Sequence, residues 1–410
     1  MTNALKDYIT VTAAYWAFML TDGALRMLVL LQFHEWGYSP LQLAFLFLLY
    51  EFFGIVTNLF GGWLANRFGL KSTLVYGLAL QVLAILMLSG LDKSWSTAFA
   101  VAYVMCAQAL SGIAKDLTKM SSKTAIKFLI PKDEGSKLFK WVAVLTGSKN
   151  AIKGAGFFTG AWLLQSTGFQ NSLWIMATGI FIILVFAQTQ LPKSIGKAKK
   201  KSKLSSVFSQ SQQINQLSAA RVFLFGARDI WFVVGVPIFL HSVLHWSFSQ
   251  VGSFMAFWVI AYGFIQASAP LILKRISRQE HPDAKNALQL ITTLCAVTAI
   301  ISIGLFTPLN PSYLILIGLF SFGAIFALNS SVHSFLILDY SQDERAAINV
   351  GFYYMANAAG RLIGTLMSGL LYQLGGLAAC LIGSTLFLAL CSFFTWKLTH
   401  SQTQIIKETT

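Results

Sequence analysis

The sequence predicts an all-α membrane protein in which twelve transmembrane helices form two pseudo-symmetric bundles of six. Of its 410 residues, 56% are hydrophobic and only 11% are charged, whereas a soluble protein carries about 25% charged residues. Apolar blocks of about 20 residues recur along the chain, which is the length that crosses ~30 Å of hydrocarbon as a helix. A polar segment near the middle divides these blocks into six and six.

The twelve spans follow one another with short polar connections. We expect them at about 8–35, 41–64, 70–90, 96–117, 140–165, 171–191, 217–243, 248–272, 285–306, 311–335, 346–373 and 376–398. The chain therefore divides into an N-terminal bundle over 1–191, a basic linker over 192–215 and a C-terminal bundle over 216–410. Only Lys6 precedes the first apolar run and no cleavage site follows it, so we expect no signal peptide.

Lysines and arginines collect in alternate loops, which predicts the orientation in the membrane. One set of loops contains Arg67, Lys71, a group from Lys119 to Lys137, a group from Lys193 to Lys203, and Arg345, whereas the opposite loops contain only Lys93. Because cytoplasmic loops carry the excess of Lys and Arg, we expect both termini in the cytoplasm. The net charge of +15 then reflects solvated loops, and we expect no nucleic-acid partner.

The two halves resemble each other at an offset of 210 residues. Trp36 precedes the second span as Trp246 precedes the eighth, and Gly154 corresponds to Gly364. The pair Asp133-Glu134 likewise corresponds to Asp343-Glu344. Internal repeats of this kind are typical of secondary transporters, which bind their substrate near the bilayer midplane.

Charged residues inside the predicted spans are the candidate functional residues. The bases are Arg26, Lys149, Lys153, Arg221, Arg228 and Arg361, and the acids are Asp22, Glu51 and Asp229. Each costs roughly 2.5–3.5 kcal/mol at a helix centre, so nine of them require an explanation. Arg221 lies nearer the cytoplasm, where it could snorkel, and we give it less weight.

These charges have a structural and a functional interpretation. The structural one pairs Asp22 with Arg26, Asp229 with a neighbour and Glu51 with a lysine, which would still leave three bases without an acid. The functional one assigns that surplus to an anionic substrate, bound by Arg26, Lys149, Lys153, Arg228 and Arg361. Asp22, Glu51 and Asp229 would then carry a proton or compete for the bases. Lys149 and Lys153 share one helix face, and the repeat places Arg361 opposite Ala151, between them.

The segment between the second and third spans resembles the signature loop of the major facilitator superfamily. The matching residues are Gly62, Asn66, Arg67, Gly69 and Lys71. Asn66 stands where the superfamily usually has Asp, which weakens the charge relay of that loop but leaves the fold unaffected. The chain shows no nucleophile–base pair, phosphate loop or metal cluster, and its four cysteines lack metal-ligand spacing. We therefore expect no enzyme activity, cofactor or metal.

A narrower resemblance lies in the first two spans. Tyr15-Trp16, the stretch from Thr21 to Leu31 and the stretch from Tyr50 to Leu64 are similar to the organoarsenical efflux permeases of bacterial arsenic-resistance operons. The resemblance implies export of 1-arseno-3-phosphoglycerate across the bacterial inner membrane, arsenate resistance, and a functional partnership with a glyceraldehyde-3-phosphate dehydrogenase. The alternatives are an organophosphate/phosphate antiporter or a general multidrug exporter of the same superfamily. A receptor or membrane enzyme would need a signalling domain or a catalytic constellation.

Overall fold

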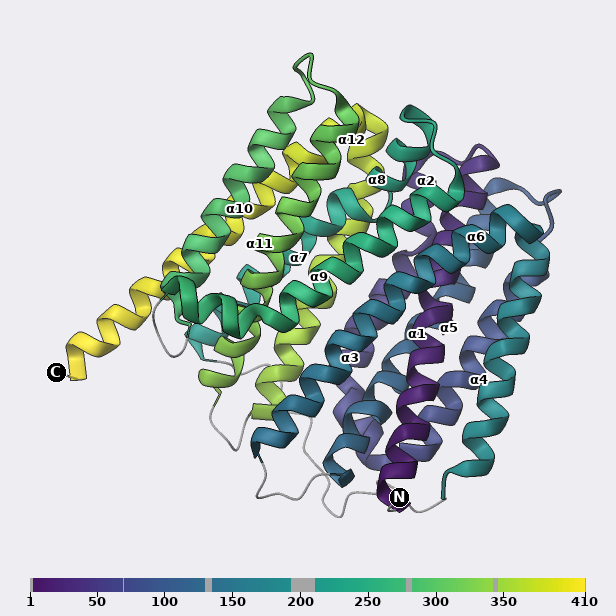
Figure 1. The fold of residues 1–410 in the computed structure, drawn as a ribbon, viewed down its shortest axis with the longest axis horizontal. Helices are drawn as coiled ribbons and strands as arrows, with labels where there is room; N and C mark the ends of the chain where they lie inside the picture. Colours follow the sequence, from purple (N-terminus) through teal and green to yellow (C-terminus); the bar gives the residue numbers. More distant parts are fainter. Residues whose placement is uncertain are drawn as a thin grey trace. The chain divides into compact units, whose positions relative to one another are not determined.

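The computed structural model describes residues 3–68, 70–129, 135–192, 211–277, 282–341 and 346–409, and these ranges are helical with short connections and no strand. Figure 1 shows the arrangement. The helices are α1 (Asn3–Glu35), α2 (Pro40–Leu46), α3 (Leu48–Phe68), α4 (Leu70–Ser89), α5 (Thr97–Leu129), α6 (Gly135–Gln190), α7 (Gln212–Phe232), α8 (Gly235–Ile238), a π-helical turn (Phe239–Val243), α9 (Phe248–Ser277), α10 (Ala284–Gly304), α11 (Pro311–Asp339) and α12 (Ala346–Thr409).

Ten helical segments of the described chain are long and apolar enough to cross a membrane, and two of these are double length. The long helix α6 changes direction at Gly168, where φ is +77°, and α12 does so at Gly375 and Gly376. A positive φ favours glycine because it has no Cβ. Each long helix therefore supplies two crossings, and the predicted twelve-helix fold is confirmed.

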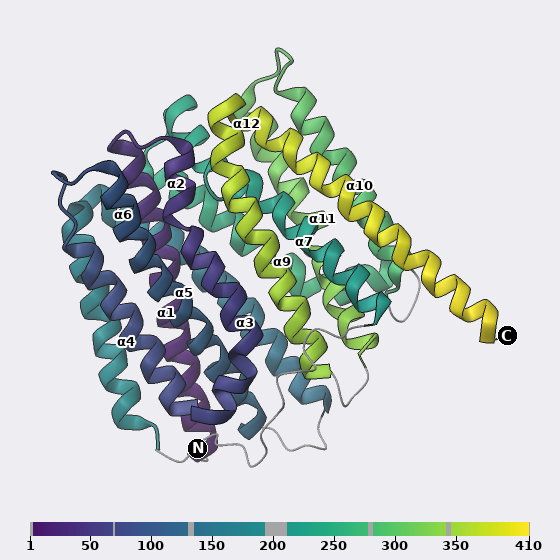
Figure 2. The ribbon, with the colours of Figure 1, turned by 180° about the vertical axis from the view of Figure 1, so that it is seen from behind.

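The chain folds into two compact units. Unit 1 comprises Met1–Tyr38, Phe45–Lys203 and Trp246–Ile260, and unit 2 comprises Ser39–Ala44, Leu204–His245 and Ala261–Thr410. Within unit 1, α1 packs along α6, and α5 packs against both α3 and α4 (Figures 1 and 2). Within unit 2, α7 packs along α12, and α10 packs against α11 and α12. Much of the predicted linker, 193–210, lies outside the described residues.

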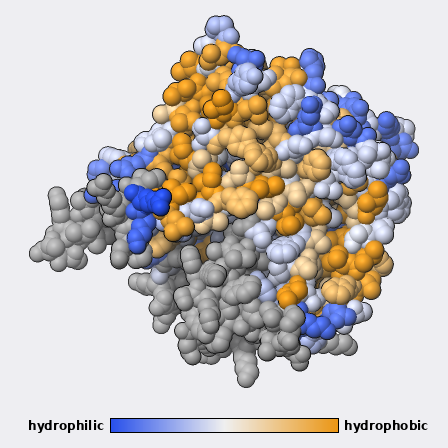
Figure 3. Space-filling model, in the orientation of Figure 1, coloured by the Kyte–Doolittle hydropathy of each residue, from blue (hydrophilic) through white to orange (hydrophobic). Residues whose placement is uncertain are grey.

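The surface of unit 2 is apolar where a soluble protein would be polar. Figure 3 shows large apolar areas over α10 and α11, to which the exposed side chains of Ile300 and Ile317 contribute. Polar residues such as Asp229 and Asn329 lie inside instead, at 1% and 0% exposure. This pattern fits helices that face lipid hydrocarbon and enclose their polar groups.

Candidate functional site

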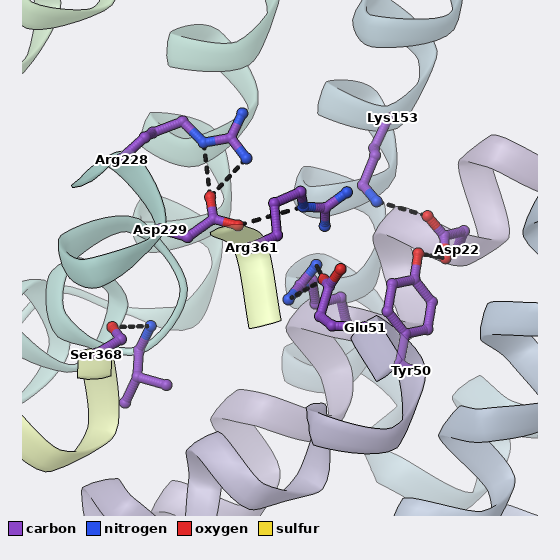
Figure 4. Close-up of polar contacts among 10 residues, drawn as sticks. Asp22, Tyr50, Glu51, Lys153, Arg228, Asp229, Arg361 and Ser368 are labelled. Carbon is purple, nitrogen blue, oxygen red and sulfur yellow. Dashed lines mark hydrogen bonds and ion pairs between the residues drawn. The ribbon is translucent and has the colours of Figure 1, made fainter. Parts of the chain in front are cut away.

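Unit 1 contains a buried acid held by a base and a hydroxyl from two other helices. Asp22 of α1 is 3% exposed. Its Oδ2 lies 2.6 Å from Lys153 Nζ of α6, and its Oδ1 accepts a 2.6 Å hydrogen bond from the Tyr50 hydroxyl of α3 (Figure 4). Both carboxylate oxygens are therefore engaged, as a buried charge requires.

Small residues bring α1 and α6 close enough to make this contact. A Cβ at Gly156 would collide with the carbonyl oxygen of Leu20, and one at Gly160 would collide with that of Ala24. A Cβ at Gly23 would come within 2.5 Å of the Lys153 carbonyl oxygen. The glycines thus let the two backbones touch. This contact places the Cα of Lys153 beside α1, so its side chain can reach Asp22.

A second ion pair in unit 1 joins Arg26 of α1 to Glu51 of α3. Arg26 donates through both Nη atoms to Glu51 Oε1 at 3.3 Å, and its guanidinium lies 5.0 Å from the Phe47 ring centroid. The expected pairing of Asp22 with Arg26 is therefore wrong, and Glu51 has an arginine where the structural interpretation gave it a lysine. The reason is the close approach of α6, which gives Asp22 to Lys153 and leaves Arg26 to the carboxylate on α3.

Unit 2 contains one carboxylate that two guanidinium groups share. Asp229 Oδ1 lies 2.5 Å from Arg228 Nη2 and accepts a 2.7 Å bond from Arg228 Nε, while Oδ2 accepts a 3.3 Å bond from Arg361 Nε of α12 (Figure 4). The side chain of Asp229 is 1% exposed, whereas those of Arg228 and Arg361 are 16% and 20% exposed. The expectation that Asp229 pairs with a neighbour is confirmed.

The α7–α12 contact is built in the same way as the α1–α6 contact. A Cβ at Gly360 would collide with the Val222 carbonyl oxygen, and one at Gly364 would come within 2.6 Å of the Gly226 carbonyl oxygen. Gly360 and Gly364 are spaced by four residues, as Gly156 and Gly160 are.

The two acid–base pairs are also spaced alike in the sequence. The acid and base are 131 residues apart in unit 1 and 132 apart in unit 2. Asp22 and Lys153 are therefore the counterparts of Asp229 and Arg361. The sequence offset of 210 placed Arg361 opposite Ala151, so it did not identify Lys153 as the counterpart of Arg361.

The helix that carries Asp229 breaks immediately after it. α7 ends at Phe232 and α8 begins at Gly235. The hydroxyl oxygen of Ser368 accepts hydrogen bonds from the amides of Val234 and Gly235 at 3.1 and 3.2 Å, and Figure 4 shows Ser368 at one of these contacts. These amides lie at a helix start and have no partner of their own within a helix. Ser368 of α12 therefore holds the break next to Asp229.

The remaining predicted residues are Lys149 and those of the signature loop. Lys149 is half-buried one turn before Lys153 on α6. In the predicted signature loop, Gly69 and the side chains of Asn66 and Arg67 lie outside the described residues, as does the environment of Gly62. Lys71 donates to the carbonyl oxygens of Gln188 and Leu191 at 2.7 and 2.5 Å, where a cation complements the C-terminal end of α6.

Sequence reasoning missed Asp116. This carboxylate is fully buried on α5, accepts a 2.5 Å bond from Thr57 Oγ1 and lies 3.4 Å from Lys119 Nζ. Lys115, the preceding residue, places its ammonium 4.1 Å from the Tyr50 ring centroid. The predicted span ends at residue 117, but α5 continues to Leu129. The i,i+3 pair Asp116–Lys119 at the end of the apolar run was the signal that could have identified it.

Around these contacts, the described residues of each unit include more bases than acids. In unit 2 Asp229 contacts both Arg228 and Arg361. In unit 1 Asp22, Glu51 and Asp116 each contact one base, and Lys149 and Lys115 are further bases of α6 and α5. Among the described residues no group of His, Cys, Asp and Glu could hold a metal ion. Guanidinium and ammonium groups in such positions can bind an oxyanion.

Apolar spans that enclose charged side chains, built as two repeated halves, define a secondary transporter. A family model described as Major Facilitator Superfamily matches residues 9–365. The chain belongs to this superfamily and is a membrane transporter rather than an enzyme.

Comparisons with individual proteins are more distant. A Na(+), Li(+), K(+)/H(+) antiporter of Planococcus maritimus is 29% identical over 140 residues, which cover 34% of this chain and 32% of that protein. Among solved structures, a bacterial homologue of the iron transporter ferroportin in its inward-facing state superimposes with a TM-score of 0.67 at 13% identity, covering 96% of this chain and 98% of that one. Its outward-facing state gives 0.65 at 14% identity, covering 96% and 99%. These two likenesses concern the fold alone.

Proposed function

We propose that the protein is a secondary active exporter of an organic arsenate or phosphate anion, working by alternating access. The observation that carries this proposal is the sharing of Asp229 by Arg228 and Arg361. Two guanidinium groups bring two positive charges to one carboxylate, and both side chains are partly exposed. A site with this net positive charge can attract an oxyanion, which arginine binds in a bidentate geometry.

The corresponding residues of unit 1 support the same chemistry. Lys153, Lys149 and Arg26 provide point charges and a guanidinium beside the carboxylates Asp22 and Glu51. Each acid would carry a proton, or would compete with the anion for its base and so favour release. Energy coupling follows from the superfamily rather than from the geometry.

The resemblance of the first two spans to organoarsenical efflux permeases supplies the substrate. We propose 1-arseno-3-phosphoglycerate, whose phosphate and arsenate groups both suit Arg and Lys, and whose export would confer arsenate resistance. A glyceraldehyde-3-phosphate dehydrogenase would form it from arsenate and would be a functional partner. The proposed location is the bacterial inner membrane with both termini in the cytoplasm.

Uptake into inside-out vesicles tests the proposal. Vesicles that contain the protein should accumulate the arsenylated compound, generated outside them by glyceraldehyde-3-phosphate dehydrogenase with arsenate, above the level of empty-vector vesicles. Competition by 3-phosphoglycerate should reduce the uptake only if the site also accepts the plain organophosphate, which would favour the phosphate antiporter. Equal accumulation in both kinds of vesicle would exclude this substrate.

Monovalent cation/proton antiport is a second candidate, because the antiporter of P. maritimus is the sequence relative described above. Such a transporter needs a carboxylate for its cation. In the described part of the chain, the carboxylates of Asp22, Glu51, Asp116 and Asp229 each lie within 4 Å of a Lys or Arg. A cation would have to displace that base, so the geometry favours the anion. Sodium-dependent proton movement in the same vesicles would reverse this preference.

A further inference from the structure

Ring contacts define how α7 and α11 pack within unit 2. Phe322 of α11 contacts Trp231 of α7 with ring centroids 5.0 Å apart, and Phe326 contacts Phe225 at 5.1 Å. One turn further along α11, Ser330 contacts Arg221. The two helices therefore run antiparallel, and α11 positions four residues apart form one face toward α7.

Arg221 lies within this contact and is only 4% exposed. Its Nε donates to Asn357 Oδ1 at 3.0 Å, and its Nη1 donates to Ser330 Oγ at 3.1 Å and to the Ser330 carbonyl at 3.3 Å. The guanidinium carbon lies 3.9 Å from the Phe225 ring centroid. All of these partners are neutral, and no carboxylate of the described chain lies within 4 Å. The position of Arg221 in the packed interior also excludes the snorkelling that the sequence suggested.

Several buried polar atoms next to Arg221 have no hydrogen-bond partner among the described residues. They are Nδ2 and Oδ1 of Asn329, Nδ1 and Nε2 of His333, and Oγ of Ser218. Asn329 and His333 lie on the turns beside Ser330 on the face toward α7, and Ser218 lies one turn before Arg221. All three side chains belong to residues that are 2% exposed or less. Proteins pair the large majority of such groups with protein or ordered water, so this cluster points to an occupant that pairs them.

We propose that these residues form a binding site for a small monovalent anion of the size of chloride. Arg221 supplies the charge, and Asn329 Nδ2, a ring N–H of His333 and the Ser218 hydroxyl supply further donors. Water alone would satisfy the hydrogen bonds but would leave a buried guanidinium without a counter-charge, which is costly. Arg221 lies seven residues before Arg228, about 10 Å along α7, so this site is separate from the Asp229 cluster and independent of the proposed substrate.

Thermal unfolding of the purified full-length protein tests the site. The experiment replaces gluconate by chloride at constant ionic strength. The midpoint temperature of unfolding should rise with the chloride concentration and then saturate. Arg221→Gln should weaken the apparent chloride affinity by about tenfold or more, since it removes a charge-assisted interaction. Arg275→Gln, which changes an exposed arginine of α9, should respond like the unaltered protein. Equal responses of the unaltered protein and Arg221→Gln would overturn the proposal.

A second measurement does not depend on the Arg221 variant folding. Crystals of the unaltered protein grown in sodium bromide should show an anomalous bromide peak bounded by Arg221, Asn329 and His333. Asn329→Leu should lower the peak height or remove it. Bromide bound elsewhere with no peak at Arg221 would show that the buried charge is balanced without a small anion, and the proposal would fail.

Discussion

Lys153→Met removes the base from the α1–α6 ion pair and leaves the rest of the contact in place. Methionine keeps the length of the lysine stem, so the packing against α1 changes little. Asp22 would then be a carboxylate at 3% exposure that has lost its ion-pair partner and keeps the hydrogen bond from the Tyr50 hydroxyl at 2.6 Å. The prediction is a large loss of stability that originates in Asp22 rather than in the methionine.

The magnitude follows from the burial of the pair, since Asp22 is 3% exposed and its Oδ2 lies 2.6 Å from Lys153 Nζ. Breaking a buried ion pair by removing one partner costs about 3–5 kcal/mol. We expect Lys153→Met to lower the free energy of unfolding by that amount. Asp22→Asn combined with Lys153→Met should recover most of it, because neither charge remains. Arg361→Met should cost only about 1–2 kcal/mol, since Arg228 still lies 2.5 Å from Asp229.

Unfolding of the purified protein in mixed micelles measures all of these changes. Lys274→Met, at an exposed lysine of α9, is the matched control and should stay within about 0.5 kcal/mol of the unaltered protein. The reasoning is refuted if Arg361→Met is as damaging as Lys153→Met, or if the double variant of Asp22 and Lys153 is no more stable than Lys153→Met alone.

Three further changes test the packing and the site. Gly156→Ala should lower the free energy of unfolding by about 1–3 kcal/mol through overpacking. Gly179→Ala, whose added Cβ meets no atom within 4 Å, should be neutral or slightly stabilising in the same micelle assay, because alanine suits a helix interior better than glycine. Similar losses in both variants would contradict the α1–α6 contact. Ser368→Ala should lower the free energy of unfolding by about 1–3 kcal/mol, because two buried amides lose their acceptor. Ser321→Ala, at an exposed serine, should change it little. Equal effects of the two variants would show that Ser368 does not hold the break in the helix. Arg228→Lys should raise the KM for the transported anion by about tenfold in vesicle uptake through loss of bidentate donation, and an unchanged KM at equal abundance would exclude Arg228 from the site.

The fold was predictable because membrane insertion constrains every span separately. The length of an apolar block determines whether it crosses the bilayer, so the block pattern could indicate α1 or α10 without knowledge of any partner. The same reasoning identified Asp22, Lys153, Asp229 and Arg361 as costly residues. It needed only their surroundings in the sequence, since charge inside a span is expensive wherever the side chain points.

The pairing of those charges was not predictable, because it depends on which backbones approach closely. Asp22 and Arg26 are four residues apart on one helix, which favours an i,i+4 pair. The glycines at 23, 156 and 160 bring α6 so near that Lys153 reaches Asp22 instead. Glycine spacing is visible in the sequence, but it does not name the helix that packs on it. The continuation of α5 past residue 117 was not predictable for the same reason, because polar residues in the continued helix find partners on other helices. Asp116 was overlooked because it lies next to the predicted end of this span.

The equivalence of Asp22–Lys153 and Asp229–Arg361 makes each acid a competitor of the anion in the proposed transport cycle. Each acid would compete with an incoming anion for the same base, so removing the charge of the acid should strengthen anion binding. Asp229→Asn keeps the size of the side chain and removes the charge that Arg228 and Arg361 share. We therefore expect this variant to bind sulfate more tightly than the unaltered protein in a calorimetric titration of the purified protein. Equal affinities would mean that Asp229 only holds Arg228 and Arg361 in place, and that the anion does not displace it.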